Sequence, residues 1–171
     1  MHKIDHDMPK ELSDALIGED ELGLVIRSHL YIENLLDELL VLLFPCPKHY
    51  EEMQLNYSVK VRLACAMGLN PSCKSMLLAV GDIRNKFAHN LGKSIDENMV
   101  RDFHSKVDDD LRLATSEILN NINAENNLKS FTDAHPRDQY FFLVVRLWSI
   151  MLKAVNQAKR RIKKGTFKKG T

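Results

Sequence analysis

Glycine and proline are scarce in this sequence: the 171 residues include 7 glycines and 5 prolines. Turn-rich all-β sandwiches and barrels use more of both, so the composition argues against those classes. Hydrophobic residues make up 44% of the chain and charged residues 27%, which is the balance of a folded globular protein. A chain of this length buries about 70% of its unfolded surface. We therefore expect a single domain with one hydrophobic core.

Cysteines and long apolar runs are also few. Cys46, Cys65 and Cys73 are an odd number and form no CxxC pair, so we expect neither a disulfide framework nor a structural zinc site. The longest apolar run, Leu39–Phe44, is far shorter than the about 18 residues of a membrane span. Residues 1–10 lack an apolar stretch, so no signal peptide is expected. The sequence predicts a cytoplasmic protein with no metal, no other cofactor and no membrane partner.

Charge is unevenly distributed along the chain. The net charge is +1, but residues 159–171 hold 7 of the 24 basic side chains and no acidic one. The remaining 17 basic and 23 acidic side chains give residues 1–158 a net charge of −6. We therefore expect a bundle domain over residues 1–158 and a basic C-terminal tail over residues 159–171.

The basic tail has two interpretations. It is either an arm that binds nucleic acid or an acidic protein, or a solvated helix end where the helix dipole favours cations. Under the first interpretation, the candidate binding residues are Lys159, Arg160, Arg161, Lys163 and Lys164.

Apolar residues recur at helical spacing over much of the chain. From residue 19 to residue 44 they are spaced alternately by three and four, which is one face of a long helix. Shorter helices are predicted over Pro9–Ile17, Lys48–Gln54, Val59–Met67 with Ser58 as N-cap, and Ser72–Phe87, with two more beginning at Asp96 and near Pro136. No βαβ alternation and no glycine-rich phosphate loop occurs. The predicted fold is an all-α, single-domain antiparallel helical bundle of five to seven helices.

Three polar residues on the first long helix were assessed as site candidates. Glu33 and Asp37 are one turn apart, and they form an acidic binding patch, approach Arg84, or belong to an ordinary solvated helix face. His29 lies on the apolar stripe, where a histidine is more often a hydrogen-bonded core residue than a ligand.

The segment Asp82–Asn90 concentrates polar and cationic side chains at the predicted end of a helix. Asn85 and His89 are four residues apart and share a face, whereas Arg84 and His89 are about 140° apart on an ideal helix. Arg84 and His89 therefore converge on one substrate only if the helix loosens near His89, or if two copies of the chain face each other in a homodimer.

Such a convergence would suit RNA cleavage without a metal. His89 would take the proton from a ribose 2′-hydroxyl, because imidazole titrates near neutral pH. Arg84 would hold the phosphate and stabilise its developing charge, and Asn85 would orient either group. The partner subunit would supply the second histidine as proton donor. The alternative is a helix C-terminus whose cations complement the dipole and whose last residues adopt a cap conformation.

The hexapeptide Arg84–His89, Arg-Asn-Lys-Phe-Ala-His, resembles the Arg-Asn-x-x-x-His signature of HEPN domains. These are small α-helical bundles; many are dimeric, metal-independent ribonucleases, and others are inert binding modules. The wider stretch over residues 20–110 resembles the MltR family, named for the mannitol operon repressor. The similar segments are Tyr31–Phe44 and Ser58–Leu69, followed by the helix that ends in the hexapeptide and by Asp96-Glu97.

The MltR resemblance implies a non-enzymatic regulatory protein that acts through protein–protein contacts. Its partner would be a transcription component, or a toxic nuclease whose basic surface suits the acidic body, in which case this chain would be an immunity protein or antitoxin. MltR-like chains tend to lack the Arg-Asn dipeptide that this sequence keeps. The alternative is therefore a HEPN-type endoribonuclease toxin that uses Arg84, Asn85 and His89 and has RNA as its partner.

Overall fold

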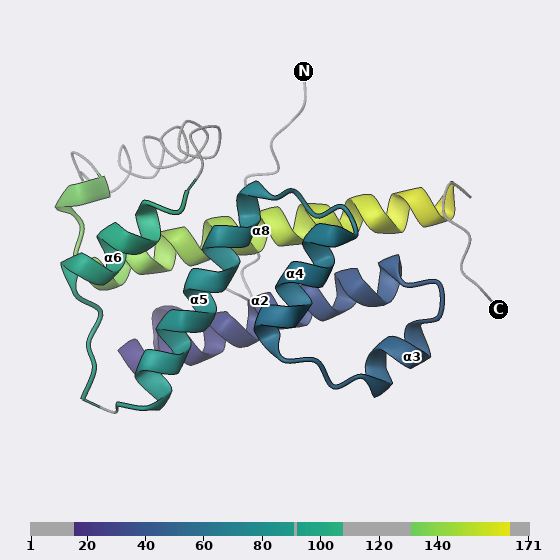
Figure 1. The fold of residues 1–171 in the computed structure, drawn as a ribbon. Helices are drawn as coiled ribbons and strands as arrows, with labels where there is room; N and C mark the ends of the chain where they lie inside the picture. The colour runs from purple at the N-terminus through teal and green to yellow at the C-terminus, as the bar shows by residue number, and fades with distance from the viewer. Residues whose placement is uncertain (1–15, 91, 108–130, 165–171) are drawn as a thin grey trace, which may run out of the picture.

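The computed structural model describes residues 16–90, 92–107 and 131–164, and this part of the chain is all helical, with no strand. It contains six α-helices, which confirms the predicted all-α bundle of five to seven helices. They are α2 (Glu21–Leu43), α3 (Pro47–Glu52), α4 (Tyr57–Ala66), α5 (Ser72–Ala88), α6 (Glu97–His104) and α8 (Pro136–Lys163) (Figure 1). The predicted loop over residues 120–129 and most of the helix over Pro9–Ile17 lie outside the described residues.

The two long helices α2 and α8 form the centre of the fold and make its most extensive helix–helix contact. The apolar stripe predicted for α2 is the face that is buried, with Ile32, Leu36 and Leu40 fully enclosed. Asp20 caps the N-terminus of α2 by accepting a hydrogen bond from the Gly23 N–H. Most of the free energy that holds these helices together therefore comes from burial of aliphatic side chains.

The direction of α8 differs from the antiparallel expectation, because α2 and α8 run in the same direction. The start of α8 contacts the start of α2: the Arg137 guanidinium donates to the backbone oxygens of Ile17 and Glu19. Near the other end, Lys159 Nζ lies 2.6 Å from Glu38 Oε1. Figure 1 shows both helices running the same way across the molecule. Parallel neighbours require a long connection, and residues 44–135 supply it.

Helices α4 and α5 form an antiparallel pair that crosses the two long helices on one side (Figure 1). Gly68 ends α4 with a φ of 103°, which is the left-handed conformation that glycine adopts without strain, as the sequence predicts for a position just after a helix. The predicted cap at the start of α4 is wrong by two residues. Asn56, not Ser58, is the N-cap, and its side chain accepts from the Val59 N–H.

A glycine brings α4 and α5 close together near the candidate site. A Cβ atom on Gly81 would lie 2.8 Å from Cδ1 of Tyr57, so only glycine leaves room for that ring. The Tyr57 hydroxyl donates a 2.9 Å hydrogen bond to the Leu77 carbonyl one turn earlier in α5. The ring of Tyr57 then reaches His29 of α2, with 4.5 Å between ring centroids. Tyr57 of α4 therefore sets how closely α4 packs against α5 and α2.

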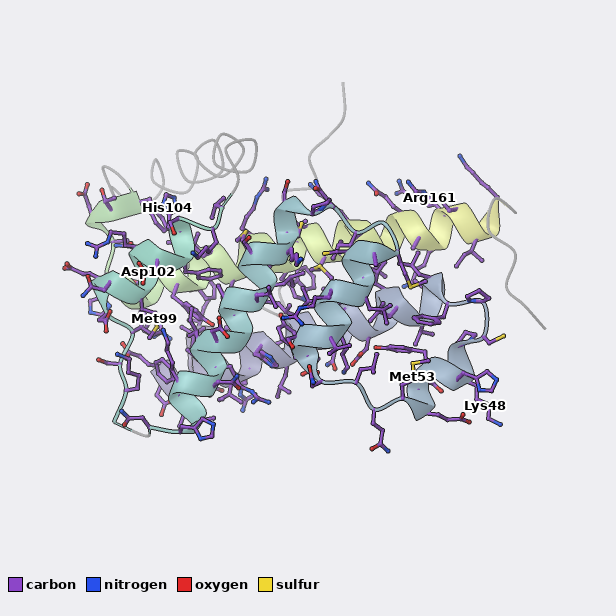
Figure 2. All side chains as sticks on the ribbon, in the orientation of Figure 1. Lys48, Met53, Met99, Asp102, His104 and Arg161 are labelled. Carbon is purple, nitrogen blue, oxygen red and sulfur yellow. The ribbon has the colours of Figure 1, made fainter. Side chains whose placement is uncertain are left out.

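The short helices α3 and α6 lie at opposite ends of the bundle, as the positions of Lys48 and His104 show (Figure 2). Helix α3 follows α2 directly and returns Tyr50 to it, stacked on Phe44 at 5.2 Å between ring centroids. Helix α6 packs its buried face on α8 and is capped by Asp96, as predicted. Both short helices therefore extend the core that α2 and α8 begin.

Helix α8 is long and apolar enough, by length and composition alone, to cross a membrane, with a mean hydropathy of 1.2 over its best window. Leu143, Leu147 and Met151 of this helix are fully buried in the bundle core. A core helix of a globular protein gives the same signal, so this helix is weak evidence for a membrane span. The helix continues to Lys163, past the expected domain boundary at residue 158.

Candidate functional site

A cluster of charged side chains lies where α4 crosses α2. Lys60 of α4 places its Nζ atom 2.9 Å from Glu33 Oε1 and 2.8 Å from Asp37 Oδ2. The side chain of Lys60 is only 15% exposed, while those of Glu33 and Asp37 are 21% and 37% exposed. Two carboxylates thus share one ammonium in a partly dehydrated position. The predicted acidic pair is therefore compensated within the chain and does not form a bare acidic patch.

Tyr50 of α3 completes the charge cluster from the other side. Its hydroxyl donates a 2.5 Å hydrogen bond to Asp37 Oδ1, so both oxygens of that carboxylate are engaged. Burial and this hydrogen bond raise the pKa of Tyr50. Burial alone would favour neutral Lys60, but hydrogen bonds to Asp37 and Glu33 outweigh it and raise the pKa of the ammonium. The Lys60 ammonium therefore stays charged, and its contacts together with the Tyr50 hydrogen bond tie α2, α3 and α4 together.

His29 lies just inside this cluster and is 2% exposed. Its Nδ1 is 3.6 Å from Glu33 Oε2, and that nitrogen has no hydrogen-bond partner among the described residues. The burial expected of His29 is confirmed, but the expected hydrogen bond is not found at Nδ1. Burial lowers the pKa of His29; Glu33 opposes this, and the charges of Arg84 and Lys60 add to it. His29 is therefore a neutral core imidazole at neutral pH.

The segment Arg84–His89 forms the last turn of α5 and its cap. Helix α5 runs regularly to Ala88, and the backbone N–H of His89 donates to the Asn85 carbonyl at 3.1 Å. The helix therefore does not loosen before His89, which removes one of the two ways to bring Arg84 and His89 together. No hydrogen bond or ion pair joins these two side chains in the described part of the chain.

Arg84 and His89 have different surroundings in one chain. Arg84 is half-buried, and its Nη1 donates a 2.9 Å hydrogen bond to the neighbouring Asn85 Oδ1. It faces α2 closely enough for its charge to lower the pKa of His29. His89 is exposed at the helix end. Arg84 with Asn85 can hold an anion, and the His89 imidazole is open to solvent, but no contact in a single chain brings these groups to one point.

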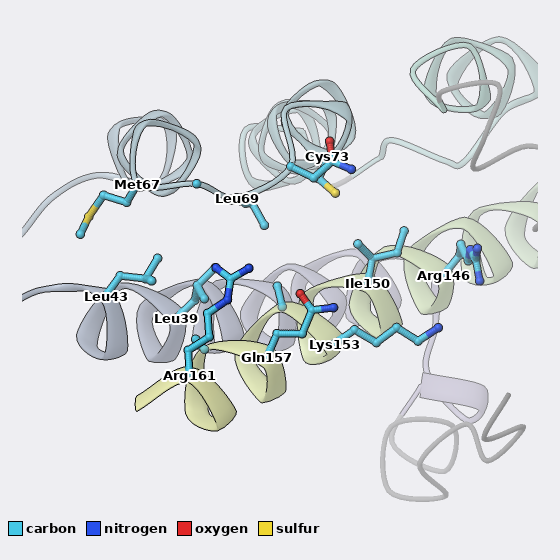
Figure 3. A pocket seen from close by; sticks show the side chains of 14 residues that line it. Leu39, Leu43, Met67, Leu69, Cys73, Arg146, Ile150, Lys153, Gln157 and Arg161 are labelled. Carbon is cyan, nitrogen blue, oxygen red and sulfur yellow. The ribbon is translucent and has the colours of Figure 1, made fainter. Parts of the chain in front are cut away.

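The predicted binding residues of the basic tail do not act as one group. Lys159 pairs with Glu38 of α2, and Arg161 faces a groove beside α8 (Figure 3). Arg160, Lys163 and Lys164 are exposed on the last turn of the same helix. The part of the tail that the structure describes is thus largely a continuation of α8.

The sequence interpretation missed the two residues that complete the charge cluster, Lys60 and Tyr50. Lys60 had a usable signal: with Tyr57, Val61 and Ala64 it follows the three-and-four spacing of the inward face of α4. A lysine on that face requires a buried carboxylate partner. Tyr50 had no comparable signal, because its contact with Asp37 depends on how the chain folds back after Pro45.

The described residues contain no group of three or more histidine, cysteine or acidic side chains that could hold a metal ion. Cys73 is buried, and burial raises the pKa of its thiol to about 11, so it is not an activated nucleophile.

The fold and the site together define an all-α bundle with an internally compensated charge cluster beside a cationic helix end. No protein-family model, no curated protein and no solved structure matches this chain.

Proposed function

We propose that this chain is a non-enzymatic, cytoplasmic binding protein that regulates another macromolecule through protein–protein contacts, in the manner that its MltR resemblance implies. The observation that carries this proposal is the separation of Arg84 from His89. Arg84 is half-buried and donates to the exposed Asn85 side chain, and His89 caps a regular helix. Metal-independent RNA cleavage needs both groups on one phosphate.

Exposed apolar side chains supply contact positions for a partner protein. Leu30 on α2 is 50% exposed and Met53 after α3 is 51% exposed. Burial of such side chains against a partner would remove apolar surface from water, which favours binding. The partner would be a transcription component, or a basic nuclease attracted by the net −6 charge of residues 1–158.

The proposal is tested by isolating the complex from native cells with a tagged chain, followed by size-exclusion chromatography. We expect one protein that co-elutes in fixed stoichiometry. Leu30→Glu is expected to lose it, while Ser75→Glu, an exposed change on α5, keeps it. If no protein co-elutes in fixed stoichiometry, the proposal is wrong.

A second candidate, a HEPN-type ribonuclease toxin, is favoured by one observation. Both Arg84 and His89 retain solvent access at the same end of α5, and the His89 side chain has no partner among the described residues. A second copy of the chain would then supply the facing His89 in a homodimer.

Total tRNA incubated with pure protein and EDTA separates the two functions. The binding protein is expected to leave the tRNA intact. Cleavage that is lost in Arg84→Ala and in His89→Ala, and partly restored when those two variants are mixed, would establish a shared dimeric active site. Restoration by mixing is specific to that geometry, because neither variant alone contains both groups.

A further inference from the structure

A groove of about 380 Å³ lies between α8, the C-terminal part of α2 and the α4–α5 connection (Figure 3). Its floor is aliphatic and sulfur-containing, formed by Leu39, Met67, Leu69, Cys73 and Ile150. No aromatic side chain lines it. This volume lies at the low end of the range for small-molecule pockets, about 300–1,000 Å³. The lining suits a flexible apolar chain better than a base that needs a stacking platform.

The charged residues of the groove are all of one sign. Arg146, Lys153 and Arg161 of α8 line it, and no acidic residue does. Lys153 is exposed and forms no ion pair with any described residue. In Figure 3 its side chain extends along α8 toward Arg146, while Arg161 and Gln157 lie nearer the other end. The groove therefore presents an apolar floor with cations at both ends.

Among the described residues, no acidic side chain pairs with Arg146. Its Nε atom is buried and has no hydrogen-bond partner among the described residues. Burial lowers the pKa of Arg146, because nothing nearby offsets the lost hydration of its charge. Burial of an uncompensated guanidinium charge is costly, and an anion in the groove that pairs with the outer nitrogens of Arg146 would reduce that cost.

We propose that this groove binds a small organic anion with an apolar body, of the medium-chain carboxylate class. The hydrocarbon chain lies on the floor formed by α2 and the α4–α5 connection, and the carboxylate pairs with Arg146 and Lys153. Guanidinium groups bind carboxylates through paired N–H donors, and the two outer nitrogens of Arg146 can supply such a pair. The proposal does not depend on the function proposed above, because the groove shares no residue with the Arg84–His89 segment.

Calorimetric titration of the full chain with decanoate, below its micellar concentration, tests the proposal. We expect saturable binding of one decanoate per chain. Decanol, which keeps the hydrocarbon chain and removes the charge, is expected to bind at least about tenfold more weakly than decanoate. Decyltrimethylammonium and acetate should not bind. Equal binding of decanol and decanoate would overturn the proposal. So would non-saturating uptake of many decanoates per chain.

Variants locate the binding site. Arg146→Gln and Lys153→Gln are each expected to weaken decanoate binding by about tenfold, whereas Lys163→Gln, an exposed change on the same helix, stays within about twofold. Because Arg146 is half-buried, Ala154→Phe provides a second block that fills the groove without changing charge. Circular dichroism confirms the fold of each variant.

Anionic vesicles distinguish a free carboxylate from a lipid surface. In a co-sedimentation assay, the protein should not pellet with phosphatidylglycerol vesicles under conditions in which decanoate binds. Sedimentation with vesicles combined with no decanoate binding would contradict the proposal and assign the cations of α8 to a membrane surface instead.

Discussion

Two regions of the molecule differ in how their positive charge is balanced: the contact between α4 and α2, and the groove beside α8. In the first, Lys60 is held by the carboxylates of Glu33 and Asp37 within 2.9 Å. In the second, Arg146 and Lys153 line an apolar groove with no acidic side chain. Both regions place cations against the aliphatic body of α2. They differ in whether the chain itself supplies the counter-charge.

This difference indicates that the first region contributes to the stability of the fold and the second is available to bind a ligand. A compensated, partly buried cluster resists removal of any one member, because the remaining charges lose their partners. An uncompensated cation contributes little to folding and remains available to a ligand. The same substitution, Lys→Met, should therefore have different consequences in the two regions.

The largest expected effect is that of Lys60→Met. It leaves the carboxylates of Glu33 and Asp37 without their ammonium in a position where Lys60 is 15% exposed. We expect a loss of about 2–3 kcal/mol in the free energy of unfolding, less than for a fully buried pair because Asp37 is partly solvated. Urea denaturation followed by circular dichroism measures it.

Lys153→Met is the matched control for that measurement. Lys153 is exposed and pairs with no described residue, so its loss should change the free energy of unfolding by less than about 0.5 kcal/mol. Equal losses for the two variants would remove the distinction between the regions.

Gly81→Val tests the close approach that positions the compensated cluster. A Cβ there meets Cδ1 of Tyr57 at 2.8 Å, so the ring must move and α4 with it. We expect a loss of about 2 kcal/mol from overpacking. Ala88→Val, on an exposed position of the same helix, should cost about 0.5 kcal/mol or less. Thermal unfolding measures both variants. A similar loss of stability in the two would mean that the contact with Tyr57 is unimportant.

The sequence predicts the helices well because their signals are local. The three-and-four stripe of α2, the Asp96 cap, Gly68 and Pro136 each act through neighbouring residues, and each occupies the predicted position. The Asn56 cap was missed because Ser58, two residues on, is an equally good local candidate.

Contacts between distant segments were not predictable in the same way. The parallel direction of α2 and α8 depends on pairs such as Ser28 with Tyr140, whose oxygens lie 3.2 Å apart. Helical periodicity identifies a buried face but does not specify the direction of its partner. The groove has the same origin, because Leu39, Met67 and Arg146 come from three separate segments. The hexapeptide Arg84–His89 was placed correctly at a helix end, since that position follows from local pattern alone.

A pH-dependent loss of stability is expected from His29. Its pKa is lowered in the folded state, so between that value and the unfolded value of about 6.5 the unfolded chain binds more protons. The stabilisation is complete above pH 6.5 and is lost as the pH falls below it. His29→Gln should flatten the curve of unfolding free energy against pH by up to about 1.4 kcal/mol per pH unit.

If the His29→Gln variant retained the pH slope of the parent chain, the buried imidazole would not be the titrating group.

The N-cap of α4 gives a smaller effect. Asn56 Oδ1 accepts from the Val59 N–H at 3.1 Å, and α4 carries Lys60 into the cluster. Asn56→Ala should cost about 1 kcal/mol. Ser58→Ala, which removes only the hydroxyl contact to the Asn56 side chain, should cost a few tenths. If chemical denaturation showed a larger loss of stability for Ser58→Ala than for Asn56→Ala, Ser58 would be the cap, as expected from the sequence.

The smallest effect concerns Lys159 and Glu38, an ion pair between the tail and α2 that resembles the compensated region. Their contact is short, 2.6 Å between Nζ and Oε1, yet the side chains are 52% and 41% exposed. Water already solvates both charges, so a double-mutant cycle with Lys159→Gln and Glu38→Gln should give a coupling below about 0.5 kcal/mol. The equivalent cycle on Lys60 and Asp37 should exceed about 1 kcal/mol, because burial and the shared Glu33 strengthen that pair. Two similar couplings would mean that distance, not dehydration, determines the strength of ion pairs in this bundle.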